Sequence, residues 1–231
     1  MRVLLFFLGV MPLLRAEEPP FVKVELVTLA LYQPLQKYSV QHGEARSLLD
    51  AGVTGIGQSI AYEGPARLSL FAPTPEAWIP GSAPLPPVAQ VDLPPNASWV
   101  LLICIKRKDQ PLRLMACDVS GEQVHAGDYV FFHFAKSEVA VKLGEETFSL
   151  KPGEIRVVDR KEWRNQSADL LIRLVTKVGN KNRLVFSSVW GHHSGHRNYV
   201  FLFNGEHASM PVVMRKIQEV GPTLTEKESG H

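Results

Sequence analysis

The chain has few cysteines, no excess of charge and almost no long helical periodicity. Two cysteines in 231 residues are too few for a disulfide scaffold. Lys and Arg number 25 against 23 Asp and Glu, whereas nucleic-acid binders concentrate positive charge to neutralise phosphates. A composition of 45% apolar and 21% charged residues argues against a disordered chain. The length suits one large all-β domain or two small ones.

Residues 1–16 are expected to be a secretory signal peptide. Arg2 is followed by twelve uncharged, mostly apolar residues, and Ala16 is a suitable small residue at the end of the cleavage site. Leu14, two residues before Ala16, departs from the small residue preferred at that position. The run is shorter than the ~20 apolar residues of a transmembrane helix, and no second run reaches that length. We therefore expect a secreted or periplasmic protein with no transmembrane segment after signal removal. The alternative is a buried N-terminal strand of a cytosolic protein.

Export affects the interpretation of other residues. Loss of Arg2 and Arg15 leaves 23 basic and 23 acidic side chains, which weakens the case for a nucleic-acid partner further. Asn96-Ala97-Ser98 and Asn165-Gln166-Ser167 fit the N-glycosylation pattern of a eukaryotic secretory pathway. An exported chain also enters a compartment where a disulfide persists.

The mature chain is typical of an all-β sandwich or barrel. Residues 72–87 hold six of the 17 prolines and predict a loop or edge, because proline removes a ladder donor. Residues 212–220 fit either a helix or a final strand, and 221–231 a loose tail. Short apolar segments between turn residues predict strands at 21–31, 54–62, 67–71, 99–106, 112–119, 129–134, 138–143, 147–150, 154–158, 169–177, 183–190 and 198–203.

A faint internal repeat predicts two similar packed β units. Residues 64–72 align with 127–135 at an offset of 63, and 93–101 align with 150–158 at an offset of 57. Shared turn chemistry alone is the other explanation of this match. The expected organisation is a signal peptide at 1–16, an N-terminal β unit at 17–120, a C-terminal β-sandwich unit at 121–220 and a flexible tail at 221–231.

Some segments resemble known proteins. The segments 127–134, 139–144, 150–154 and 187–190 resemble small secreted bacterial all-β proteins, a family that implies no activity. The turn Lys151-Pro152-Gly153 is also similar to that of cupins. A cupin metal site needs closely spaced histidines with a following carboxylate, and no such cluster precedes Leu150.

The densest group of possible metal ligands is His192, His193 and His196. Three imidazoles can hold a catalytic zinc with an open position. The segment lies between two predicted strands and contains Gly and Ser, which also suits a solvated hairpin loop. Both interpretations stay open.

Cys104 and Cys117 flank a predicted turn at 107–111. If the turn centres between Gln110 and Pro111, the two residues face each other and can form a disulfide. If it centres two residues earlier, they lie too far apart and remain free thiols. The sequence does not decide between the two.

The four tryptophans are candidates for stacking on sugar rings. Trp99 and Trp190 lie in apolar strands and are expected in the core. Trp78 and Trp163 lie among polar or proline-rich residues, so exposure is expected there. The alternative is that they are hydrophobic clips that hold loops on the sandwich.

The sequence favours a non-catalytic binding or structural protein. Gly191-His192-His193-Ser194-Gly195 lacks the spacing of a nucleophile elbow, and there is no phosphate loop or dinucleotide fingerprint. We assign no catalytic, cofactor or metal residue and expect no cofactor. The expected partner is another envelope or extracellular protein, or a glycan. The alternatives are a cupin-like metal-dependent enzyme using the three histidines, and a carbohydrate-binding module.

Overall fold

The computed structural model describes residues 20–42, 45–73, 86–159, 161–163, 166–207 and 210–220. Within these ranges the only helical segment is the 3₁₀ turn η1 (Lys161–Trp163). No helix in the described part is long and apolar enough to cross a membrane. The expected signal peptide and tail lie outside the described residues.

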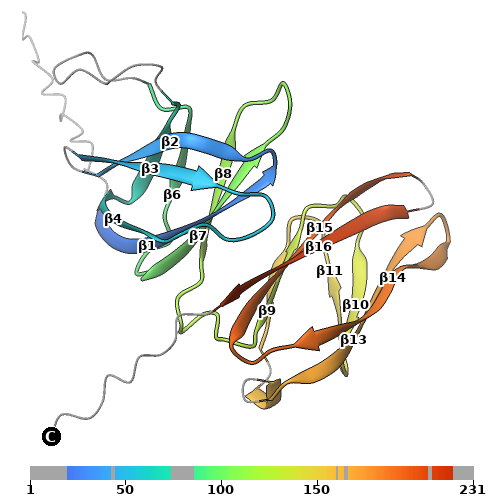
Figure 1. Cartoon of the computed structure of the whole chain (residues 1–231). Coiled ribbons are helices and arrows are strands. Elements are labelled where there is room, and N and C mark those ends of the chain that lie inside the picture. The colour runs from blue at the N-terminus through green and yellow to red at the C-terminus, as the bar shows by residue number, and fades with distance from the viewer. Residues whose placement is uncertain are drawn as a thin grey trace, which may run out of the picture.

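The described residues contain sixteen strands in four four-stranded sheets, as predicted for an all-β sandwich (Figure 1). In hydrogen-bonding order, sheet A contains β4 (Ile60–Pro65), β1 (Phe21–Tyr32), β7 (Trp99–Lys106) and β8 (Arg113–Asp118); sheet B contains β3 (Ala45–Ala51), β2 (Leu35–His42), β5 (Arg67–Phe71) and β6 (Ala89–Asp92). Sheet C contains β12 (Ile155–Val158), β9 (Tyr129–His133), β15 (His196–His207) and β16 (Met210–Val220); sheet D contains β11 (Glu146–Leu150), β10 (Val139–Leu143), β13 (Ala168–Val178) and β14 (Lys181–His192).

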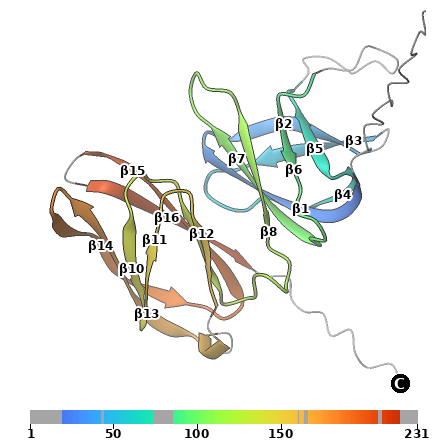
Figure 2. The ribbon, with the colours of Figure 1, turned by 180° about the vertical axis from the view of Figure 1, so that it is seen from behind.

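The two halves of the chain have the same topology. Numbered from the first strand of each half, both contain one sheet of order 4-1-7-8 and another of order 3-2-5-6. In both, the first strand pairs in parallel with the seventh, as β1 does with β7 and β9 with β15. Figures 1 and 2 show the two similar pairs of sheets, so the prediction of two similar packed β units is confirmed. The exact division at residue 120 remains a prediction; it falls between β8 and β9.

The predicted alignment of the repeat is wrong. Residues 64–72 lie across β4 and β5, whereas 127–135 contain β9, whose counterpart by strand order is β1. Likewise, 93–101 lead into β7, whereas 150–158 lead into β12, the counterpart of β4. The alignment compared strands with similar local patterns, because a turn followed by alternating residues is common to many strands.

Most strands were predicted close to their observed positions. The ambiguous segment 212–220 lies in strand β16. The strand predicted at 54–62 begins only at Ile60, and β2, β3 and β6 were missed. Strands β2 and β6 carry exposed polar side chains, and β3 exposes the apolar Leu48, so none of the three shows a clear apolar alternation. The turn at residues 151–153 is confirmed, with φ of 82° at Gly153.

In the part of the chain that the structure describes, three hydrophobic cores hold the sheets together. The first lies between sheets A and B and the second between sheets C and D. The third lies between sheets A and C. It joins the first sheet pair, made of sheets A and B, to the second sheet pair, made of sheets C and D. The outward face of β7 reaches this third core through Leu101 and Ile103, while Val100, Leu102 and Cys104 reach the first. The predicted strand at 99–106 is therefore buried on both faces.

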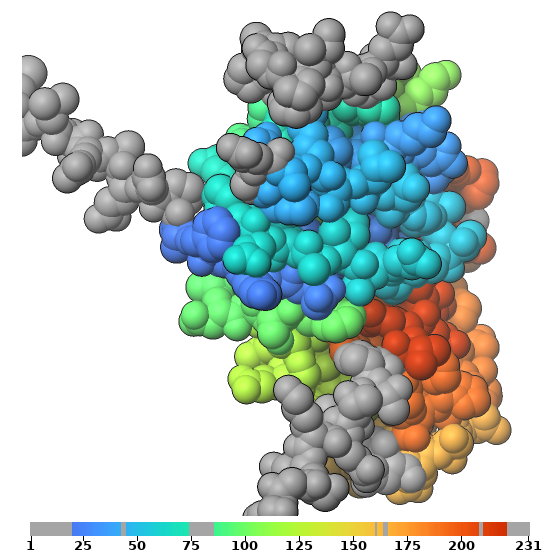
Figure 3. Space-filling model, turned by 60° about the vertical axis from the view of Figure 1, so that its left-hand side comes forward, coloured from blue at the N-terminus to red at the C-terminus, as the bar shows by residue number. Residues whose placement is uncertain are grey.

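The third core packs the same face of the two repeats together. Leu29 on β1 pairs with Ile103 on β7, and Phe132 on β9 pairs with Phe201 on β15. All four side chains are fully buried in this core. The ring centroids of Phe132 and Phe201 lie 4.9 Å apart in stacked planes. Figure 3 shows residues of the N-terminal half of the chain (blue to cyan) lying directly against residues of the C-terminal hairpin (red). The packing thus resembles a symmetric dimer interface formed within one chain.

We predict that Phe201→Ala lowers the free energy of unfolding by about 3–5 kcal/mol, because it leaves a cavity in the third core. The matched control is Phe21→Ala, since Phe21 is 66% exposed and surface changes cost within about 0.5 kcal/mol. Urea unfolding followed by circular dichroism measures both. Equal losses in the two variants would contradict the role of the third core.

Candidate functional site

Within the described residues, the three histidines considered as metal ligands do not form one cluster of ligand atoms. His192 is buried at the end of β14, where its Nδ1 lies 3.2 Å from the Tyr129 hydroxyl and its Nε2 2.6 Å from the Trp163 carbonyl. Both ring nitrogens are therefore engaged within the second sheet pair. His193 is exposed, and its ring lies 5.3 Å from that of His196. The solvated-loop interpretation is wrong for His192, which contacts the second core through Tyr129 and Trp163.

The tryptophans contribute mainly to packing. Trp190 is in the second core, as predicted, and stacks on Tyr129 with centroids 6.0 Å apart. Trp99 packs against the third core. Trp163 was expected to be exposed, but it packs edge-on against Tyr129 and contacts the second core. Trp163 therefore acts as the hydrophobic clip that the sequence offered as the alternative. Trp78 lies outside the described residues.

The two cysteines are free and lie on opposite faces of sheet A. In the hairpin register, Cys104 pairs with Leu114, and Cys117 pairs with Leu101. Cys104 belongs to the first core, whereas Cys117 packs against the third. Because neighbouring side chains in a strand pair share a face, the sulfur atoms point away from each other. Burial raises the pKa of each thiol to about 12.

We predict that reduction leaves the intact mass of the purified protein unchanged, because there is no disulfide to break. The raised thiol pKa values also predict slow alkylation by iodoacetamide at pH 8 in the native state and fast alkylation in 6 M urea. Mass spectrometry measures both. A mass gain of two hydrogens on reduction would contradict the register of the hairpin.

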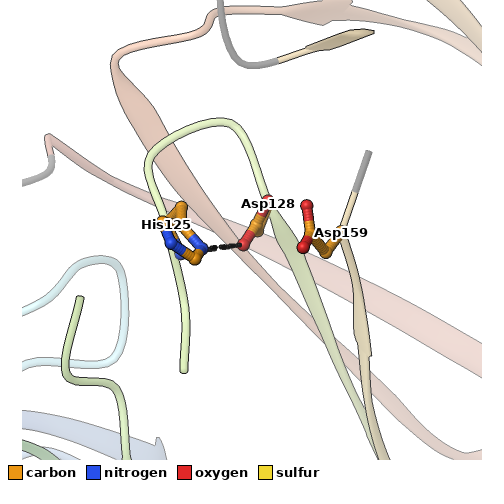
Figure 4. Close-up of side chains that lie close together, drawn as sticks. All are labelled: His125, Asp128 and Asp159. Atoms are coloured by element: carbon orange, nitrogen blue, oxygen red, sulfur yellow. Dashed lines mark hydrogen bonds and ion pairs between the residues drawn. The ribbon is translucent and has the colours of Figure 1, made fainter. Parts of the chain in front are cut away.

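A group of three possible metal ligands lies near the start of β9, where the segment that connects β8 to β9 ends. His125 and Asp128 flank a turn, and Asp159 follows β12 (Figure 4). One ligand atom from each lies within 4.8 Å of the others. Around a zinc ion with bonds of ~2.1 Å, ligand atoms lie within about 4 Å of one another. The three side chains would therefore have to approach each other to share an ion.

The observed contacts of Asp128 are structural. Its buried Oδ2 accepts the backbone N–H of His125 at 2.7 Å and lies 3.4 Å from His125 Nδ1. Its carbonyl accepts the backbone N–H of Asn198 on β15 at 3.0 Å. These contacts close the turn and attach it to sheet C. Sequence analysis missed this group because Asp159 is more than 30 residues from the other two.

His133 is a second buried polar group, at the end of β9. Its Nε2 lies 2.7 Å from the Ser137 carbonyl, and within the described residues its buried Nδ1 has no hydrogen-bond partner. Burial lowers the pKa of His133, and this outweighs the opposite effects of the Ser137 carbonyl and the Glu154 carboxylate. The folded protein therefore holds this imidazole neutral, with Nε2 donating to Ser137.

This lowered pKa predicts a loss of stability in acid. Above about pH 6.5, the ordinary pKa of histidine, His133 is neutral in both the folded and the unfolded state and the stabilisation is complete. As the pH falls below that value, the unfolded chain takes up the proton first, so stability falls by at most ~1.4 kcal/mol per pH unit for this group. We predict a shallower acid loss in His133→Gln than in the wild type, measured by urea unfolding from pH 7.5 to 5. The exposed His207→Gln is the matched control, and equal slopes in wild type and His133→Gln would be the contrary result.

A pocket with charged and apolar lining opens between the two sheet pairs, at the end of the third core. We call this pocket of about 320 Å³ the mouth. Its lining comes from the ends of β1 and β7 and the start of β8 on one side, and from β9 and the turn before β12 on the other. The hairpin β7–β8 that forms one wall extends beyond its sheet in Figure 2. The mouth therefore exists only when both halves of the chain are packed together.

Two arginines of the first sheet pair line the mouth. Arg107 donates from Nη2 to the Tyr32 hydroxyl at 2.6 Å, and its guanidinium lies 4.4 Å from the centre of that ring. Arg113 is exposed at the start of β8. Among the described residues, neither guanidinium forms an ion pair. The Glu154 carboxylate also lines the mouth, but its Oε2 accepts the backbone N–H of Lys151 at 2.9 Å.

Aromatic rings continue from the mouth into the third core. Phe132 and Phe134 line it, and Phe134 stacks on Phe203 with centroids 5.9 Å apart. Tyr32 packs edge-on against Phe203 at 5.6 Å and adopts a φ of 78°, which non-glycine residues rarely adopt. The mouth thus combines positive charge with an apolar floor. Sequence analysis interpreted residues 107–111 only as a turn, because the contact between Arg107 and Tyr32 spans 75 residues.

The C-terminal hairpin forms a second pocket on the other side of Tyr32. It has about 450 Å³ and is lined by residues of β15 and β16, including Phe203, Met214 and Arg215. Arg215 donates from Nη1 to the Val53 carbonyl at 3.1 Å, so this guanidinium connects the two sheet pairs. Burial lowers the pKa of Arg215. Arg215 is partly buried and packs over the rings of Phe201 and Phe203, whereas Arg113 in the mouth is exposed, so the mouth is the better candidate site.

Comparisons with known proteins do not assign the chain to a family. No model of a known protein family matches it, and no curated protein shows significant similarity to it.

Proposed function

We propose that the protein is a secreted or periplasmic, non-catalytic binding module that takes its ligand at the mouth. The observation that carries this proposal is the position of Arg107 and Arg113, which form no ion pair within the described residues, above an apolar floor formed by both sheet pairs. A buried or half-buried site of this kind binds a ligand that has an apolar body and a negative group. The pattern of residues 1–16 supports export.

The two alternatives from the sequence receive less support. A metal enzyme built on His192, His193 and His196 requires convergent ligands, and both nitrogens of His192 contact protein atoms. A sugar platform requires an exposed aromatic face, and Trp163 packs on the second core. Tyr32 is 43% exposed beside the mouth, so a glycan with an acidic group remains a second class of ligand to be tested.

We predict that the mature chain binds peptides on an array of short peptides and fails to bind on a glycan array. The double variant Arg107→Ala/Arg113→Ala is expected to lose at least tenfold in affinity for the selected peptides, since hydrogen bonds to charged groups contribute about 1.5–3 kcal/mol each. The charge-matched control Lys181→Ala/Arg183→Ala changes two exposed residues of β14 and is expected to bind as the wild type. Equal binding by both double variants would refute the proposal, and glycan binding that the arginine variant abolishes would select the second class of ligand.

A further inference from the structure

Strand β12 is a free edge beside the mouth. It is the outermost strand of sheet C and pairs only with β9 within the described residues. Three of its four residues are exposed, and two of these are apolar: Ile155 is 46% exposed and Val157 is 40% exposed. Exposed apolar edge strands are unusual in monomers, because they recruit other strands.

The apolar side chains of β12 extend the face of sheet C that packs on sheet A. In the register with β9, Ile155 lies opposite Phe132, and Val157 lies opposite Val130. Phe132 and Val130 are buried in the third core. Side chains opposite each other in a strand pair lie on the same face. Sheet A therefore covers β9 but leaves the continuation of the same face on β12 open.

The backbone of β12 is also oriented to accept a strand. The backbone N–H of His133 donates to the Glu154 carbonyl at 3.0 Å, so the carbonyl of residue 154 points toward β9. In an antiparallel pair, residues alternate between pointing their backbone groups toward the partner strand and away from it. The N–H and C=O groups of Ile155 and Val157 therefore point outward, away from β9.

The direction of an added strand follows from the charge at the mouth. Strand β12 begins at Ile155, which itself lines the mouth together with Arg107 and Arg113. A strand that adds antiparallel to β12 ends at this point, so its terminal carboxylate reaches the two guanidiniums. A parallel strand would bring a positive N-terminus there instead. The two guanidiniums outnumber the one carboxylate of the mouth, Glu154, which already accepts the backbone N–H of Lys151, so the charges favour the antiparallel direction.

From these observations we infer that the ligand of the mouth is the extended C-terminal segment of another polypeptide. It adds antiparallel to β12, covers Ile155 and Val157 with apolar side chains, and places its free carboxylate between Arg107 and Arg113. At about 3.3 Å per residue, four to six residues span β12 and reach the mouth. This inference rests on the proposed function and specifies its ligand.

The test uses a six-residue peptide, Lys-Val-Thr-Val-Thr-Val, which is acetylated at its N-terminus and carries a fluorophore on the lysine side chain. It is prepared with a free C-terminal carboxylate and as the C-terminal amide. By fluorescence anisotropy on the full mature chain, we expect the acid to bind at least tenfold more tightly than the amide. Arg107→Ala/Arg113→Ala is expected to reduce binding of the acid to the level of the amide and to leave binding of the amide unchanged.

Two further measurements test the strand addition itself. Val157→Pro removes an outward backbone donor at an edge position that tolerates proline, and it is expected to weaken binding of the acid at least tenfold. Val157→Thr keeps the donor and is the matched control, with an expected change below threefold. In amide hydrogen exchange followed by NMR, the amides of Ile155 and Val157 are expected to become protected when the acid binds.

The outcomes separate this inference from the proposed function. If acid and amide bind equally, or if Ile155 and Val157 stay unprotected, the inference is wrong. The mouth still holds as a binding site in that case if Arg107→Ala/Arg113→Ala weakens binding. If that variant changes binding of no peptide, both the inference and the proposed function fail.

Discussion

The face-to-face packing of sheet A on sheet C is the interaction on which the rest of the structure depends. Each sheet pair has its own core, but the outward faces of β1 and β7 and of β9 and β15 are also apolar. In a single sandwich, outward faces alternate with polar residues. Here both outward faces would expose leucine, isoleucine, phenylalanine and tyrosine to water if the two halves separated. The repeated unit therefore requires its copy.

The candidate site is a consequence of this packing. Equivalent sheets of the two halves meet, but their edges do not coincide, so β12 extends past the cover that sheet A provides. The hairpin β7–β8 brings Arg107 to the same place from the other half. The first half supplies both arginines and part of the apolar floor, and the second half supplies the rest of that floor, so the complete site needs both halves. The packing of two similar units thus forms a site that one unit alone lacks.

The sequence predicts the positions of the strands better than their register and their tertiary contacts. Local alternation and turn residues identified most strands of the second half, where Lys151-Pro152-Gly153 and the run after Gly127 are strong signals. The disulfide question required the register between β7 and β8, which depends on packing on both faces of sheet A. The position of Trp163 depends on Tyr129, a strand residue 34 positions earlier. Contacts between residues far apart in the chain leave no local sequence pattern. The mouth could not be predicted for the same reason, because its lining comes from both halves of the chain.

Native-state hydrogen exchange measured against low concentrations of urea tests the central claim most directly. If the third core unites the two sheet pairs, the amides of β1 and β7 open with the same free energy and the same urea dependence as those of β9 and β15. The account predicts one common value for all four strands, equal to the global free energy of unfolding. Two values, with one sheet pair opening at a clearly lower free energy and a smaller urea dependence, would contradict it.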